Sequence, residues 1–135
     1  MNDYTKGGCL CGDVRYVAHG QPSNSMVCHC ETCRRTTGAP IVAWVTFATA
    51  SFSFVHGTPA QFRSSGDVNR TFCPSCGTHL TYAHDQRPQE VDITTCSLEL
   101  PGTFPPTHHS WLSDSLDWIR LDDSIPKYHR TSGDE

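Results

Sequence analysis

The fold is decided by a short stretch near the middle of the chain, Cys73-Pro-Ser-Cys76-Gly77. A second stretch near the start, Cys9-Leu-Cys11-Gly12, ends in the same Cys-Gly pair. In a metal-binding knuckle the residue after the second cysteine often takes a positive φ, which turns backbone N–H groups toward the sulfurs, and glycine adopts that φ without strain. We therefore expect one closed, structural zinc site with four thiolate ligands, Cys9, Cys11, Cys73 and Cys76.

The distance between the two knuckles along the chain excludes a simple zinc ribbon. Such ribbons place about 15 to 20 residues between their paired knuckles, whereas 61 residues separate Cys11 from Cys73. The metal would instead close a long loop and tie the beginning of the domain to its middle. A disulfide scaffold is disfavoured, because a Cys-X-Cys pair can hardly bridge to itself in an extended strand.

Length and composition predict one domain over residues 1–135. Leu, Ile, Val and Phe together number only 25, against 8 Cys. Metal binding would supply the stability that so small a hydrophobic core lacks.

We expect a cytoplasmic protein, because the start of the chain lacks a signal-peptide pattern and no apolar run approaches the ~20 residues of a membrane span. With a net charge of −4 and 2 Lys and 8 Arg scattered along the chain, we expect no nucleic-acid partner.

Two-residue alternation of polar and apolar side chains predicts a mainly β domain. We expect strands at 14–18, 41–47, 52–55, 78–82 and 91–95, with turns at 20–22, 57–59, 64–67 and 100–102. The one predicted helical turn covers residues 31–37 and is ended by Gly38 and Pro40.

The remaining cysteine group, Cys28-His-Cys30-Glu-Thr-Cys33, has no knuckle glycine after its last cysteine. Three thiolates leave the fourth position of a tetrahedral zinc open, as in catalytic sites. Such a centre carries one net negative charge, so it activates water modestly and holds an exogenous thiol well. The alternative is a second structural site, closed by Cys96 or by a histidine: His29, His79, His84 or His108. We favour the open site, because Cys96 falls in a predicted strand as a small buried residue and His29 would point away from its flanking cysteines.

The sequence resembles the glutathione-dependent formaldehyde-activating enzymes, also called the centromere protein V-like domain. Three segments carry the resemblance: Gly8-Cys-Leu-Cys-Gly-Asp-Val-Arg-Tyr16, Cys28-His-Cys-Glu-Thr-Cys-Arg-Arg35 followed by Gly38, and Phe72-Cys-Pro-Ser-Cys-Gly-Thr78. The tail also fits the family's order, with His109, Trp111, Trp118, Asp122, Pro126 and Tyr128. The resemblance extends from about Gly7 to Arg130.

This resemblance implies a β-tent fold with two zinc ions per chain. The structural zinc would be held by Cys9, Cys11, Cys73 and Cys76, and the catalytic zinc by Cys28, Cys30 and Cys33. The family's activity is a carbon–sulfur lyase type of reaction in reverse, the condensation of glutathione with formaldehyde to S-hydroxymethylglutathione. A small-molecule thiol and an aldehyde are thus the expected partners.

Several side chains are candidates for supporting roles in that reaction. The proton donor would be one of four histidines, His29, His79, His84 or His109. Arg34 and Arg35 would pair with the carboxylates of a peptide-like thiol, or would be solvated surface charges. Trp111 and Trp118 are expected in the core, with a role as interface anchors as the alternative. The competing functional class is a non-catalytic binding or scaffold module with two structural zinc sites.

Overall fold

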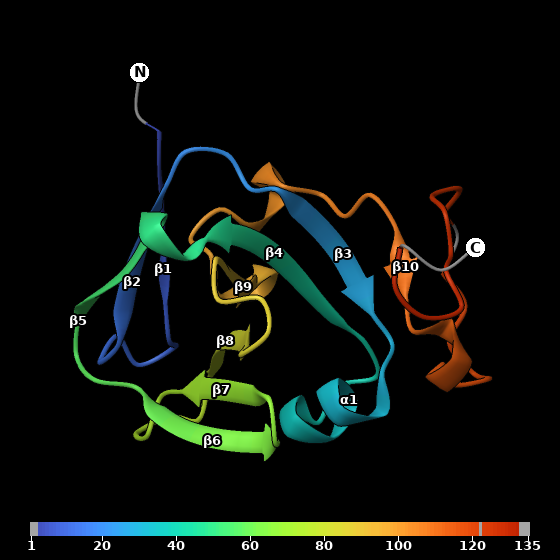
Figure 1. The fold of residues 1–135 in the computed structure, drawn as a ribbon, viewed down its shortest axis with the longest axis horizontal. Helices are drawn as coiled ribbons and strands as arrows, with labels where there is room; N and C mark the ends of the chain where they lie inside the picture. The colour runs from blue at the N-terminus through green and yellow to red at the C-terminus, as the bar shows by residue number, and fades with distance from the viewer. Residues whose placement is uncertain (1–2, 122, 133–135) are drawn as a thin grey trace.

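Within residues 3–121 and 123–132, the computed structural model contains two β-sheets and one short α-helix (Figure 1). The smaller sheet has the strand order β1 (Tyr4–Gly8), β2 (Arg15–His19), β5 (Phe52–His56). The larger has the order β10 (His109–Ser110), β3 (Asn24–Cys28), β4 (Val42–Ala48), β9 (Glu90–Thr94), β8 (His79–His84), β7 (Val68–Phe72), β6 (Ala60–Ser65). Neighbouring strands are antiparallel except β10 and β3, which are parallel. The mainly β prediction is confirmed.

The predicted helical turn is α1 (Glu31–Thr37). It ends at Gly38, which has φ +70° and donates its N–H to the Arg34 carbonyl, as a left-handed C-cap does. Four 3₁₀ turns connect other elements: η1 (Thr49–Ser51), η2 (Thr95–Ser97), η3 (Pro101–Thr103) and η4 (Leu112–Asp114). No helix in the described part of the chain is long and apolar enough to cross a membrane.

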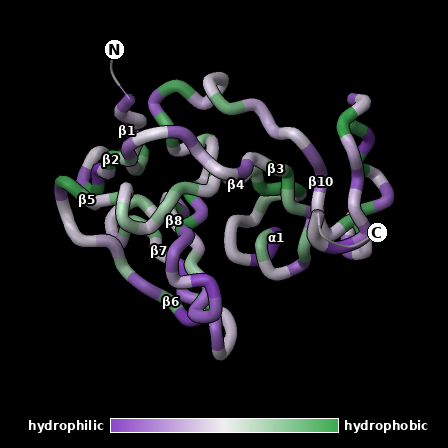
Figure 2. Tube along the Cα trace, turned by 45° about the horizontal axis from the view of Figure 1, so that its top comes forward, coloured by the Kyte–Doolittle hydropathy of each residue, from purple (hydrophilic) through white to green (hydrophobic). Residues whose placement is uncertain are grey.

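The strands that the alternation did not predict are β1, β3, β6, β7 and β10. One of these, β6, forms an edge of the larger sheet, is largely exposed, and joins β7 through the turn at Gly66 and Asp67. Figure 2 shows the chain around β6 as mostly hydrophilic. An edge strand with water on its surface needs little apolar patterning, so the period-2 signal is absent there.

The main core lies between the two sheets. Successive side chains of a strand point to opposite faces, and on β4 the completely buried Val45 and Phe47 face the smaller sheet. They pack in one cluster with Tyr16 of β2 and Ile93 of β9. Cys9 and Cys73 belong to the same buried cluster, so the knuckles border the core directly.

The opposite face of the larger sheet carries a second buried cluster. Val42 and Trp44 of β4 pack there with Cys28 and Cys33, and Trp111 lies partly buried against them. The sheet therefore separates the main core from the three-cysteine group.

The C-terminal segment returns to the free edge of β3. His109 and Ser110 pair with Val27 and Cys28, and the segment folds back on itself where the Tyr128 N–H donates to the His109 carbonyl. Trp111 is half-buried, but Trp118 is 69% exposed, so the expectation of a core position is wrong for Trp118. It lies in the irregular chain after η4, outside both sheets. Asp122, quoted for the family resemblance, lies outside the described residues.

Candidate functional site

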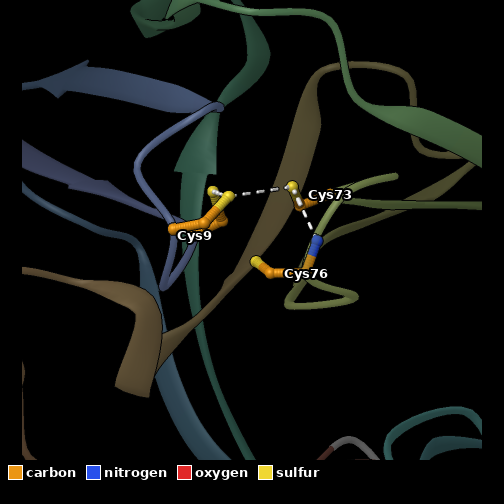
Figure 3. Close-up of side chains that lie close together, drawn as sticks. Cys9, Cys73 and Cys76 are labelled. Carbon is orange, nitrogen blue, oxygen red and sulfur yellow. Dashed lines mark hydrogen bonds between the residues drawn. The ribbon is translucent and has the colours of Figure 1, made fainter.

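The two knuckles meet between the sheets, as the shared Cys-Gly endings predicted. One loop, between β1 and β2, carries Cys9 and Cys11, and another, between β7 and β8, carries Cys73 and Cys76; Figure 3 shows the two loops facing each other. All four Sγ atoms lie within 4.8 Å of one another, with 3.6 Å between those of Cys9 and Cys11 and 3.8 Å between those of Cys11 and Cys73. All eight cysteines are free thiols.

Backbone N–H groups point at these sulfurs. The Cys9 Sγ accepts from the Val14 N–H at 3.2 Å, and the Cys73 Sγ accepts from the N–H groups of Ser75 and Cys76 at 3.3 and 3.4 Å. The glycines after the two knuckles, Gly12 and Gly77, have φ of +85° and +81°. Four converging thiols with backbone donors are a donor set that suits zinc in a closed tetrahedral site.

The third cysteine group is built at the junction of β3 and α1. Cys28 ends the strand, Cys30 is the N-cap of the helix, and Cys33 lies in its first turn. The Cys30 Sγ accepts the Cys33 N–H at 3.3 Å, and the Sγ atoms of Cys28 and Cys33 lie 3.7 Å apart. Hydrogen bonds among the three thiols lower the pKa of Cys30 and raise that of Cys28.

No fourth ligand joins this group among the described residues. The three Sγ atoms lie within 4.8 Å of one another, and the cluster contains no further Cys, His, Asp or Glu atom. The predicted strand position of Cys96 is wrong: β9 ends at Thr94, and the following turn η2 leaves Cys96 exposed. Three thiolates would suit a zinc ion with one open position.

The three cysteines border a cavity of about 320 Å³ on the outer face of the larger sheet. Its floor is one row of residues in register across five strands, since Asn24 pairs with Thr46, Thr46 with Asp92, Asp92 with Tyr82, and Tyr82 with Arg70. Aromatic side chains form part of its wall: Trp44, Tyr82 and Trp111. The cavity thus combines apolar walls with a few polar groups, as small-molecule sites do.

Arg70 is the functional candidate that the sequence analysis missed. Its side chain is buried, with 3% of the residue exposed, and both Nη atoms lie 3.7 Å from the Cys33 Sγ. The guanidinium also lies over the Tyr82 ring, 5.0 Å from its centroid. The sequence signal that could have found Arg70 is its position in the strand before Cys73. Side chains alternate between the two faces of a strand, so every second residue there lies on the cavity face.

Asp92 is a second buried polar group on the cavity floor. Its Oδ1 accepts a hydrogen bond of 2.5 Å from the Thr46 hydroxyl. Burial raises the pKa of this carboxyl group, although the Thr46 hydrogen bond acts in the opposite direction. Asp92 therefore holds a proton to a higher pH than an exposed aspartate does.

The four histidines proposed as proton donors do not line the cavity; among the described residues its lining includes His108 alone of that residue type. His29 is not part of the cavity lining, and its Nε2 lies 3.0 Å from the His109 Nδ1. The His109 Nε2 in turn lies 3.0 Å from a carboxylate oxygen of Asp123. This chain begins at two buried histidines and ends at the exposed Asp123, and it links the loop after β3 to the C-terminal segment.

The two arginines after Cys33 also have other partners. Arg34 donates to the backbone carbonyls of His29 and Asp114. These hydrogen bonds connect α1 to Asp114, the last residue of η4. Arg35 forms an exposed ion pair with Glu31. Neither lines the cavity. The exposed Arg35 fits the surface alternative, whereas Arg34 is half-buried and holds backbone carbonyls in place.

In its described part the chain is a mainly β, cysteine-rich protein with one four-cysteine and one three-cysteine cluster, each of which could hold a metal ion. The chain belongs to the glutathione-dependent formaldehyde-activating enzyme family, whose profile matches residues 4–114. The family resemblance drawn from the cysteine segments is confirmed.

Two further comparisons found one similar sequence and one similar fold. An uncharacterized lyase from Schizosaccharomyces pombe is 33% identical over 84 residues, which are 62% of this chain and 60% of the yeast protein. A crystal structure of a Rhodobacter sphaeroides protein is similar with a TM-score of 0.55 at 20% identity, covering 90% of this chain and 98% of that one. The second similarity concerns the fold alone.

Proposed function

We propose that the chain is a zinc-dependent enzyme that forms or breaks the carbon–sulfur bond of a thiol–aldehyde adduct, with glutathione and formaldehyde as the first substrates to test. The observation that carries this proposal is the three-cysteine centre, which has no fourth ligand in the described residues and borders a cavity. The family name and the lyase-named relative support the same reaction class.

The proposal assigns two zinc ions to the chain. Cys9, Cys11, Cys73 and Cys76 would hold a structural ion, and Cys28, Cys30 and Cys33 a catalytic one. Bound at the second centre, zinc would hold an exogenous thiol as thiolate, the nucleophilic form, at neutral pH.

The side chains of the cavity would orient the two substrates. In the synthetic direction the thiol loses its proton to solvent or a side chain, and the resulting thiolate sulfur bonds to the aldehyde carbon. The π pair of the carbonyl moves to its oxygen, which takes up one proton in return, so that the net reaction is the addition of S–H across the C=O bond. The reverse reaction breaks the same carbon–sulfur bond, and neither direction changes an oxidation state overall. Aromatic walls at Trp44, Tyr82 and Trp111 would exclude water and hold the adduct near the cysteines.

The test is the rate of exchange between free formaldehyde and its glutathione adduct, measured by NMR exchange spectroscopy with and without enzyme. We expect the zinc-loaded wild type to accelerate exchange, Cys30→Ser to abolish the acceleration, and Cys96→Ser, which alters an exposed thiol outside both clusters, to retain it. Equal rates for wild type and Cys30→Ser would refute the proposal. Zinc-edge X-ray absorption that finds four protein sulfurs at the second centre, unchanged by thiol, would support the scaffold alternative instead.

A further inference from the structure

Arg70 is the only buried Arg or Lys in the described part of the chain. Burying a guanidinium is costly unless an anion or hydrogen-bond acceptors compensate it. The Arg70 Nε donates to the Ser64 hydroxyl at 2.8 Å, and Nη1 donates to the Thr36 hydroxyl at 3.3 Å. These partners are neutral, so they satisfy N–H groups without balancing the charge.

No carboxylate balances that charge either. The ion pairs found among residues 3–121 and 123–132 do not include Arg70. Besides the uncharged Tyr82 ring beneath it, the guanidinium contacts the Cys33 Sγ, which both Nη atoms approach to 3.7 Å. The anion available to Arg70 is thus the thiolate of the three-cysteine centre.

The net charge expected for the metal-loaded three-cysteine centre equals the charge of Arg70 in magnitude and is opposite in sign. Three thiolates around a divalent zinc leave one net negative charge, and a single guanidinium neutralises it. The other cluster differs, because Cys11 and Cys76 are exposed and water can solvate its charge. Only the buried centre needs a cation from the protein.

We propose that Arg70 is the positioning residue that provides the counter-charge of the three-cysteine centre and allows its open position to accept an anionic thiolate. This inference rests on the proposed function, because it requires a metal at that centre. Without Arg70, a bound thiolate would raise the buried charge to two uncompensated negatives. A neutral ligand such as imidazole adds no charge, so its binding should depend little on Arg70. Arg70 would therefore determine which class of fourth ligand the centre prefers.

The test loads both sites with cadmium and records cadmium NMR spectra, in which each site gives its own resonance, while 2-mercaptoethanol or imidazole is titrated. We expect Arg70→Gln to weaken thiol binding at the three-cysteine centre about tenfold or more, as a lost charge a few ångströms away predicts, and to change imidazole binding less than about twofold. Arg70→Lys should restore part of the thiol affinity. Arg63→Gln, which removes a charge from the exposed Arg63–Asp85 pair on neighbouring β6, should match the wild type.

The four-cysteine resonance reports whether each variant is folded. Equal losses of thiol and imidazole binding, or no recovery in Arg70→Lys, would overturn the specificity role. Chelator competition gives an independent readout, since Arg70→Gln should lower metal affinity at the three-cysteine centre alone, and an unchanged ratio between the two sites would refute the counter-charge. A wild type that binds metal but no thiol would refute the proposed function, while the chelator measurement still decides the role of Arg70.

Discussion

Replacing both cysteines of the second knuckle by serine, Cys73→Ser with Cys76→Ser, tests what the four-cysteine site contributes to stability. The site links the loop after β1 to the loop after β7. Two cysteines would remain, too few for a closed zinc site. The matched control is Cys28→Ser with Cys30→Ser, which also removes two sulfurs from one cluster.

The magnitudes follow from the lengths of the loops that the two metals would close. The 61 residues between Cys11 and Cys73 correspond to about 4 kcal/mol of loop-closure entropy. In the control, the four residues between Cys28 and Cys33 correspond to about 2 kcal/mol by the same relation. The knuckle variant should therefore lose about 2 kcal/mol more than the control, a large share of the roughly 5–15 kcal/mol by which domains are usually stable.

The assay is urea unfolding of both variants and the wild type in excess zinc, followed by tryptophan fluorescence, with zinc content measured on the same samples. We expect one zinc per chain in each variant and two in the wild type. Equal losses of unfolding free energy in the two variants would refute the loop-closure reasoning. An unchanged stability of the knuckle variant would refute the structural role of the site altogether.

Two further predictions concern the cavity face of the larger sheet. Trp44→Ala should lower the free energy of unfolding by about 3–5 kcal/mol, because Trp44 is 3% exposed and its removal leaves a cavity. The control is Trp118→Ala, which changes an exposed tryptophan. Similar losses in both variants would contradict the assignment of Trp44 to the buried cluster. The raised pKa of Asp92 means that the native state binds this proton more tightly than the unfolded chain does, so its contribution to stability falls as pH rises from the ordinary carboxyl range through the raised pKa. Asp92→Asn should remove this pH-dependent loss of stability. The measurement is urea unfolding of variant and wild type between about pH 4 and 7, and parallel curves of unfolding free energy against pH would contradict the prediction.

Local chemistry made the knuckles and α1 predictable from sequence. Gly12 and Gly77 take the positive φ that the Cys-Gly endings required, and Gly38 ends the helix where expected. In each case the signal and the structure lie within a few residues of one another. The pairing of the two knuckles across 61 residues was also predictable, because their endings are chemically alike.

The cavity was not predictable, because it depends on the register of strands far apart in sequence. Arg70, Asp92 and Asn24 share one row only because β7, β8, β9, β4 and β3 align as they do. A charged residue in a short polar strand gives no hydrophobic signal that it is buried, which is why Arg70 was missed. Cys96 was misplaced for a different reason: the turn η2 interrupts an apparently continuous strand pattern.

The two faces of the seven-stranded sheet have separate consequences for how such a protein can change. On β4, Val45 and Phe47 pack in the core, while their neighbours Trp44 and Thr46 face the cavity. New ligand preferences of the cavity can therefore arise by exchanging alternate residues of the same strands, leaving intervening ones to maintain the fold. A lineage that kept its seven cysteines could diversify its chemistry in this way while its architecture stayed constant.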